Sequence, residues 1–270
     1  MTDASPIERA LRRDRLIVSG GLLAIVGLAW VFVLEGAGTG MSVRAMTSWR
    51  FPPPLIPHDN AAWPARYWLL MLLMWWVMMI AMMTPSAAPM VLLYARVARQ
   101  ARAQQQTPPA VVATAWFVLG YLLSWLAFSA AAVAAQWALE RLGLLHMMMM
   151  WSLDTWLSAT LLIAAGLYQL SPLKNICLGA CRSPARFLSR HWREGQAGAV
   201  RLGMIHGLYC VGCCWLLMAL LFAGGVMNLL WIAGLAVLVL LEKVAPYGRQ
   251  VAGVAGAAAI VAGIAVIAVA

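Results

Sequence analysis

The stretch from Gly203 to Met218, GMIHGLYCVGCCWLLM, places one histidine and three cysteines inside a segment that is apolar enough to cross a membrane. With His206 at zero and about 100° per residue, Cys210 falls at about 40°, Cys213 at about −20° and Cys214 at about 80° around a helix. The stretch therefore predicts a membrane helix that carries four side chains of soft-metal ligand type on one face.

The composition of the whole chain agrees with a membrane protein. Hydrophobic residues make up 64% of the 270 residues, charged residues only 10%, and the mean hydropathy is +0.83. Soluble domains carry about 25% charged residues. We therefore expect a single all-α domain over residues 1–270, a polytopic bundle of transmembrane helices. The net charge of +10 lies mostly in short loops, where it indicates topology and not nucleic-acid binding.

Apolar runs long enough to cross a bilayer recur along the chain, judged against the roughly 20 residues that a spanning helix needs. We expect about seven spans, near residues 16–35, 67–94, 110–138, 151–170, 202–223, 226–241 and 250–269, with a basic cytoplasmic segment at 171–201. The first run is basic and then apolar like a signal peptide, but no clear cleavage site follows it, so we expect a retained helix.

Lysine and arginine set the expected orientation, because they accumulate in cytoplasmic loops. With the N-terminus inside, fifteen of them fall in inside segments and four in outside segments. We therefore expect a multi-pass protein of the bacterial inner membrane with its N-terminus inside and its C-terminus outside. In the last span, Gly253, Gly256 and Gly263 favour close helix packing.

A second cysteine pair matches the first group. Cys177 and Cys181 are four residues apart, so a helix brings both sulfurs to one side, and both units read C-x-G-x-C. Nearby, Glu242 and Lys243 are adjacent and do not face each other on a helix. We expect each to have another partner or to face the cytoplasm.

Methionines line the second span. Met71, Met74, Met78 and Met82 recur at three- and four-residue steps and form one row along the helix. Thioethers suit copper(I), but methionine is also a flexible filler of apolar interfaces, and the row alone leaves both interpretations open. Counted in from the two faces of the bilayer, Met82 and Met83 reach the level of His206 and Cys210, so these groups can meet if the helices are neighbours.

Two prolines interrupt this methionine helix. Pro85 and Pro89 are expected to kink or unwind it in its inner half, beside the small polar residues Thr84 and Ser86. A broken helix of this kind is a common way to build a binding site at the membrane midplane.

A cluster near the outer end of the fourth span is a candidate surface for metal uptake. Its candidate residues are His146, Met147, Met150 and Asp154, with Met78 further inside. Asp154 has two interpretations, a functional carboxylate within the membrane or a helix cap. The Pro-rich loop before the second span contains His58 and Asp59, which we interpret as solvated.

Three interpretations of the cysteines remain: metal ligands, redox thiols and apolar packing. Metal binding is favoured because one histidine and three cysteines share a face, and thiolates, thioethers and one imidazole suit copper(I), with zinc as second choice. Iron–sulfur clusters need other cysteine spacings, and a bis-histidine haem lacks a second histidine inside a span.

Four blocks carry a resemblance to a known family: AMMTPSAAPM, YQLSPLKNICLGACRSP, HGLYCVGCCWLLM, and GGVMNLLWIAGL followed by Glu242 and Lys243. Over roughly residues 67–249 the chain resembles the bacterial family of predicted metal-binding integral membrane proteins of unknown function. The resemblance implies a helical membrane protein whose cysteine, histidine and methionine positions bind metal. The matching positions are Met82, Met83, Pro85, Cys177, Cys181, Cys210, Cys213 and Cys214.

Three functions follow from different classes. The first is a copper(I)-handling protein of the lipid bilayer, a transporter or a protein that loads a partner, with a periplasmic metal chaperone or a metalloenzyme as the implied partner. Without a P-loop, its transport would be passive, ion-coupled or partner-driven. The second is an oxidoreductase acting on a lipid-soluble substrate, and the third a subunit whose helices are joined by metal or thiols. Whether the chain is an enzyme stays open.

Overall fold

The computed structural model of the chain describes residues 6–47, 63–104, 110–146 and 149–269, and the named elements in these ranges are all helices. In chain order they are α1 (Pro6–Leu34), α2 (Val43–Met46), α3 (Ala65–Gln104), α4 (Ala110–Arg141), α5 (Thr155–Leu170), α6 (Pro172–Arg182), α7 (Pro184–His191), α8 (Gly195–Ala219), α9 (Leu221–Gly224), α10 (Leu229–Val244) and α11 (Gly248–Val269). The Pro-rich loop with His58 and Asp59 lies outside the described residues, so its predicted role stays untested.

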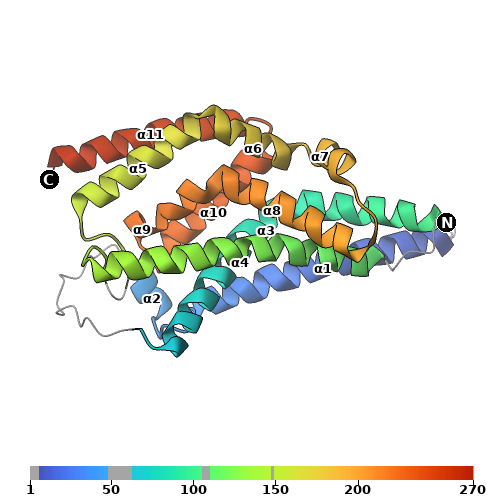
Figure 1. Cartoon of the computed structure of the whole chain (residues 1–270), viewed down its shortest axis with the longest axis horizontal. Helices are drawn as coiled ribbons and strands as arrows, with labels where there is room; N and C mark the ends of the chain where they lie inside the picture. The colour runs from blue at the N-terminus through green and yellow to red at the C-terminus, as the bar shows by residue number, and fades with distance from the viewer. Residues whose placement is uncertain (1–5, 48–62, 105–109, 147–148, 270) are drawn as a thin grey trace.

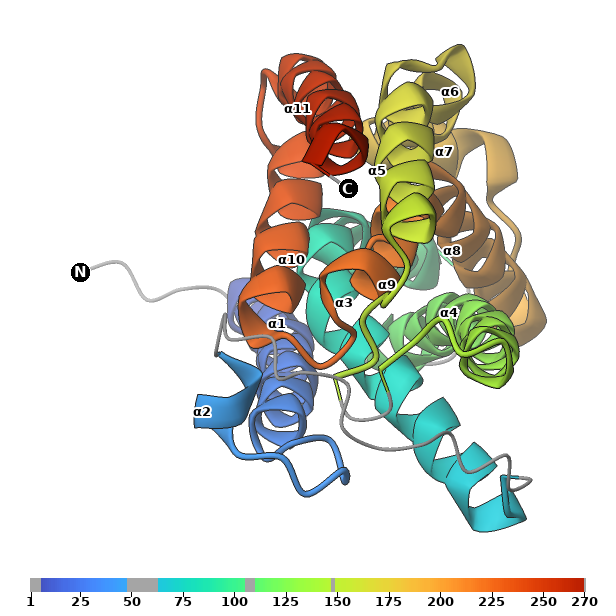
Figure 2. The same cartoon turned by 90° about the vertical axis from the view of Figure 1, so that its left-hand side faces the viewer.

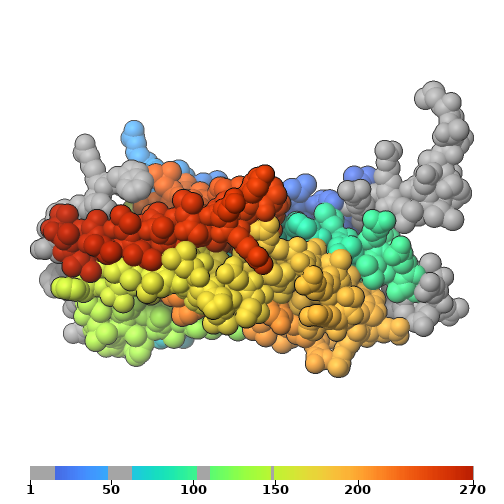
Figure 3. Space-filling model, turned by 90° about the horizontal axis from the view of Figure 1, so that it is seen from above, coloured from blue at the N-terminus to red at the C-terminus, as the bar shows by residue number. Residues whose placement is uncertain are grey.

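The long helices run back and forth along one axis of the molecule (Figure 1). Seen along that axis, α3 lies inside the bundle, next to α1, α4 and α10 (Figure 2). The α11 helix lies against α5 along one face (Figure 3). The all-helical architecture predicted from composition is confirmed for the described residues.

Five helices are long and apolar enough to cross a membrane, and the count rises to six if the bent pair of α5 and α6 is one span. The bend between these two helices is 64°. The sixth expected span, near residues 226–241, corresponds to α10, which has 16 residues and rises about 24 Å, short of a hydrocarbon core about 30 Å thick. The seven spans and their orientation therefore stay predictions.

The methionine helix does not unwind at its prolines. The α3 helix includes both Pro85 and Pro89, so the expected unwinding is wrong, whereas the axis of α3 changes direction along its length (Figure 1), in agreement with the alternative of a kink. Neighbouring side chains bond the backbone beside the prolines: the Met83 carbonyl accepts hydrogen bonds from Ser86 Oγ at 2.8 Å and from the Tyr121 hydroxyl at 3.2 Å. Such bonds help a proline-containing helix to stay helical in a membrane protein.

Glycines set the spacing of the helices around the cysteine-bearing segment. A Cβ atom at Gly203 would collide with the Phe117 carbonyl of α4, and one at Gly207 would lie 2.6 Å from the Ser124 side chain. Because these glycines face α4, the two backbones touch and the cysteine face of α8 is fixed inside the bundle.

The last helix packs through two of the three predicted glycines. Gly256 of α11 meets the Gly166 carbonyl of α5, and Gly263 meets the Ala159 carbonyl, each at 3.0 Å from a built Cβ atom. Gly253 has open space around it, so the expectation of close packing is wrong at this position.

The predicted cytoplasmic segment 171–201 is not one polar element. It folds into α6, the eight-residue α7 and the start of α8. Phe187 and Leu188 of α7 are buried against the bundle. Lys174 of α6 is fully buried, with Nζ 2.6 Å from Glu242 Oε2 of α10.

Candidate metal centre

The four predicted residues of α8 are all buried. His206, Cys210, Cys213 and Cys214 are each exposed by 2% or less of their surface. The helix that carries them packs along α4 and beside α6. The face predicted from the helical spacing therefore points into the protein and not toward the outside of the bundle.

The second cysteine pair lies beside the first. Ser171 caps α6 by accepting a hydrogen bond from the Lys174 amide, and Pro172 occupies the first turn, so the helix starts where its sequence favours a start. Cys181 interacts with Cys210 and Cys213. Cys177 Sγ lies 3.0 Å from a Cβ atom built at Gly212 of α8. Five cysteines separated by up to 37 positions in the chain thus form one group, hereafter the cysteine cluster.

One of the two predicted methionines reaches this cluster. Met83 Sδ of α3 lies 3.8 Å from Cys214 Sγ. Met82 is equally buried, but successive helical residues point about 100° apart, so its side chain leaves α3 in another direction. Counting residues in from each membrane face predicted that Met82 and Met83 lie level with the cysteines. Of the two, Met83 is the one whose thioether reaches a thiol.

A lysine that sequence reasoning did not place beside the cysteines lies at the centre of the site. Lys243 Nζ of α10 donates hydrogen bonds to Cys210 Sγ at 2.8 Å and to Ser86 Oγ at 3.2 Å. The Tyr121 hydroxyl of α4 lies 3.1 Å from the same sulfur. Together with Cys181 of α6 and Ser86 of α3, these groups bring five helices together around Cys210.

The charge of Lys243 needs an anionic neighbour because the side chain is buried. Its neighbour Glu242 points elsewhere and binds Lys174 at 2.6 Å and Gln169 Nε2 at 2.6 Å. The expectation that Glu242 and Lys243 have separate partners is confirmed. Cys210 is the group in contact with the ammonium that can carry a negative charge, so Lys243 favours its thiolate form.

The side chains are arranged for hydrogen bonding and not yet for metal coordination. Among the described residues, no group of three or more histidine, cysteine, aspartate or glutamate side chains has the geometry of a metal site. The Cys213 and Cys214 thiols donate instead to the Cys210 carbonyl of their own helix, at 3.1 and 2.9 Å. A rotation about each Cα–Cβ bond would turn these sulfurs away from the backbone.

His206 has an unused ligand atom. Its ring packs among Phe117, Tyr121 and Phe187, with centroids 6.1, 5.9 and 5.3 Å away, and its Nδ1 is buried without a hydrogen-bond partner. A buried polar atom without a partner destabilises the fold by about 1–3 kcal/mol. This cost fits a nitrogen that bonds something other than the protein.

The outer candidates do not gather at one point. Met78 is buried within the bundle, and Met147 lies outside the described residues. Asp154 accepts a hydrogen bond from the Leu157 amide at 2.6 Å and caps α5. Of its two interpretations, the structure therefore shows the cap.

His146 and Met150 are held in the loop between α4 and α5. His146 Nδ1 accepts a hydrogen bond from the Met149 amide at 3.3 Å, and burial lowers the pKa of His146. Met150 Sδ and Met71 Sδ accept hydrogen bonds from Gln136 Nε2, at 3.3 and 3.5 Å. The start of the methionine row therefore lies next to this loop.

Sequence reasoning named Ser86 and Lys243 without placing them at the cysteines, and it did not single out Tyr121. A lysine at the end of an apolar helix is costly in a membrane and is a functional signal by itself. That rule, applied to the sequence, identifies Lys243 as a candidate site residue. Tyr121 lies in a span that reads as packing alone, and only the approach of α4 to α8 reveals its role.

Comparison with known proteins identifies a family. Residues 72–266 match the family model described as PpoB2, copper chaperone. No curated protein and no solved structure matches the chain. The matched segment covers most of the chain and contains the five cysteines, Met83 and Lys243. The chain therefore belongs to the PpoB2 copper chaperone family.

Proposed function

We propose that this protein is a copper(I) chaperone embedded in the bacterial inner membrane, which holds the ion at the cysteine cluster and passes it to a partner. A single observation carries the proposal. Two separate cysteine units and the thioether of Met83 converge in one buried place. Five helices of spanning length support the location in a membrane by length and composition alone: α1, α3, α4, α8 with α9, and α11 pass that test.

The donor set favours copper(I). Thiolates and thioethers are soft ligands that select copper(I), and imidazole is compatible with it. Cys210, Cys213 and Cys181 are in mutual contact. Met83 of α3, beside Cys214, and His206, one helical turn before Cys210 on α8, are the neutral donors. A site that uses two thiolates from the cluster with Met83 or His206 has the low coordination number that this ion accepts.

The charges also favour a monovalent ion. One copper(I) ion, two thiolates and the Lys243 ammonium sum to zero, whereas a zinc ion with the same groups leaves a positive charge. An uncompensated charge in a buried site destabilises it by several kcal/mol. Zinc becomes neutral only with a third thiolate, so it remains the second choice.

The methionine row of α3 provides a route to the cluster. Met71, Met74 and Met78 are buried along the helix, starting beside Gln136 and Met150. Met83 lies about 140° around the helix from Met78 and contacts Cys214, so copper(I) would leave the row at its inner end and reach the thiols through Met83. We propose that copper(I) passes along these thioethers between the loop before α5 and the thiols.

Metal content tests the cysteine site. The full chain is expressed anaerobically with copper, purified in detergent and analysed by mass spectrometry for bound metals. We expect stoichiometric copper, lost in the double variant Cys210→Ser, Cys213→Ser. Met90→Leu is the control, since Met90 is a buried methionine of α3, the helix that carries Met83, and packs in a different apolar group. Copper retained by the double variant at the original stoichiometry would place the ion elsewhere.

The methionine route needs a measurement of its own. The double variant Met74→Leu, Met78→Leu should leave equilibrium copper binding unchanged and slow copper uptake by the purified chain. Equal uptake rates in this variant and in Met90→Leu would refute the methionine route while leaving the cysteine site intact.

A further inference from the structure

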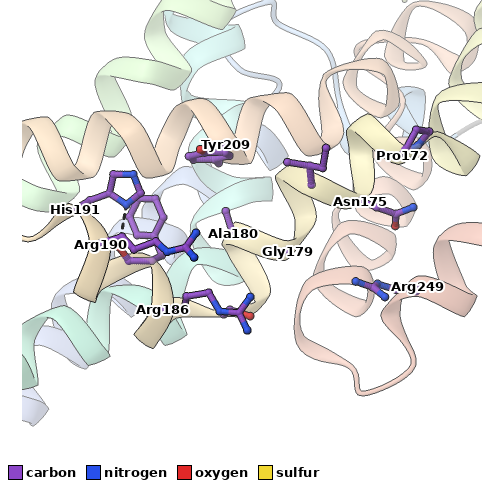
Figure 4. A pocket seen from close by; sticks show the side chains of 12 residues that line it. Pro172, Asn175, Gly179, Ala180, Arg186, Arg190, His191, Tyr209 and Arg249 are labelled. Atoms are coloured by element: carbon purple, nitrogen blue, oxygen red, sulfur yellow. Dashed lines mark hydrogen bonds between the residues drawn. The ribbon is translucent and has the colours of Figure 1, made fainter.

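A basic pocket opens on the surface where α6, α7, α8 and the start of α11 meet (Figure 4). Its volume is about 700 Å³. Arg186 and Arg190 of α7 and Arg249 of α11 line it, together with Asn175 and Tyr209. The pocket is separate from the cysteine cluster, because no cysteine is among its lining residues.

Among the described residues, the three arginines have no acidic partner. The lining residues include no aspartate or glutamate, and within the described residues none of these three side chains makes an ion pair. Arg186 and Arg190 are one helical turn apart, so they share a face, and Figure 4 shows their side chains on the same side of α7. Three unpaired positive charges around one hollow favour an anion, and guanidinium groups match phosphate oxygens in pairs.

Hydrogen bonds from the Arg182 side chain hold the turn that precedes Arg249. Arg182 donates hydrogen bonds to the carbonyls of Glu242, Ala245 and Pro246, at 3.2, 2.9 and 2.9 Å. These bonds hold the turn between α10 and α11 against the end of α6. The arginine of α11 therefore stays beside the two arginines of α7.

The rim of the pocket is apolar and exposed. Ile176 lines it and is 66% exposed, while Leu173 on the same helix and Leu208 of α8 are 58% and 61% exposed. In a protein with helices of spanning length, such side chains fit contact with acyl chains. A charged hollow beside an apolar rim suits a ligand that is itself amphiphilic.

We propose that this pocket binds the phosphate group of an anionic phospholipid, with the acyl chains along the exposed apolar side chains of α6 and α8. The phosphate lies between Arg186, Arg190 and Arg249, within reach of the Asn175 amide. Because the pocket is built partly from α6, a bound lipid braces the helix that carries Cys177 and Cys181. The proposal does not depend on copper binding.

Lipid binding by the full chain in detergent tests the proposal. Phosphatidylglycerol and phosphatidylcholine are titrated into the purified protein, and bound lipid is measured by native mass spectrometry. We expect selective binding of phosphatidylglycerol. The triple variant Arg186→Gln, Arg190→Gln, Arg249→Gln should bind it on the order of a hundredfold more weakly, from roughly fivefold per arginine.

A variant with the same loss of charge is the control. Arg96, Arg193 and Arg201 are exposed and do not line the pocket, and their combined change to glutamine should weaken binding less than about fivefold, because charges outside the pocket are largely screened. Equal losses in the two triple variants would show attraction by the general surface charge and overturn the pocket. Displacement of phosphatidylglycerol by millimolar inorganic phosphate would identify free phosphate as the ligand and overturn the lipid assignment. Equal binding of phosphatidylcholine would also overturn it.

Discussion

Replacing Lys243 by methionine removes the positive charge at the cysteine cluster while keeping a side chain of similar length. The ammonium lies 2.8 Å from Cys210 Sγ. Two unit charges at that separation interact by about 6 kcal/mol at an effective dielectric constant of about 20. Protonation of the thiol and local relaxation recover part of this energy, so we expect copper(I) binding to weaken by about 3 kcal/mol, on the order of a hundredfold.

The assay is a competition titration against a chromogenic copper(I) chelator, performed anaerobically on the full chain in detergent. Lys243→Arg keeps the charge and should stay within about tenfold of the unchanged protein. Ser86→Ala removes the other hydrogen-bond partner of the ammonium and should change affinity by less than about threefold. Thermal unfolding of each variant checks that the bundle is intact.

The opposite result has a clear meaning. If Lys243→Met binds copper(I) as tightly as the unchanged protein, or more tightly, then the ammonium competes with the ion and does not balance the thiolates. The charge argument for copper(I) over zinc would then be refuted, although the cysteine site itself would stand.

Three further predictions concern the frame around the site, and thermal unfolding in detergent measures all of them. Lys174→Met leaves the buried Glu242 carboxylate without its ion-pair partner and should destabilise the fold by about 3–5 kcal/mol. Adding Glu242→Leu to that variant should restore much of the lost stability, and no recovery would contradict the ion-pair explanation. Gly203→Ala drives a methyl group into the backbone of α4 and should cost about 1–3 kcal/mol, while Gly253→Ala, in open space, should be neutral. Burial lowers the pKa of His146 in the folded protein. Its neutral form therefore adds stability above about pH 6.5, and this stability is lost as the pH falls toward the folded-state pKa. His146→Gln should reduce the fall in melting temperature on acidification, and an unchanged fall would show that His146 does not cause it.

Several parts of the site were predictable because they follow from local spacing. The common face of His206, Cys210, Cys213 and Cys214 requires only the helical repeat, and the pairing of Cys177 with Cys181 requires only one helical turn. The approach of Met83 to Cys214 was reached by counting residues in from opposite membrane faces. Such counting gives depth but not direction, which is why it did not separate Met83 from Met82.

One expectation failed for an identifiable reason. Proline rules predict that α3 can unwind, but they describe a helix without neighbours, and Tyr121 together with Ser86 bonds the backbone at Met83. Hydropathy alone counts α10 as a span, and with 16 residues that span stays a prediction.

The sequence by itself determined that this chain is helical, with several helices apolar enough to cross a membrane, and that one histidine and three cysteines share a helical face, because hydropathy and helical spacing are properties of neighbouring residues. Only the tertiary structure decided which groups surround Cys210. Lys243, Tyr121 and Ser86 come from three other helices, brought there by glycine contacts and by a buried ion pair that turns Glu242 away from its neighbour. These contacts join residues far apart in the chain, and no local pattern encodes them.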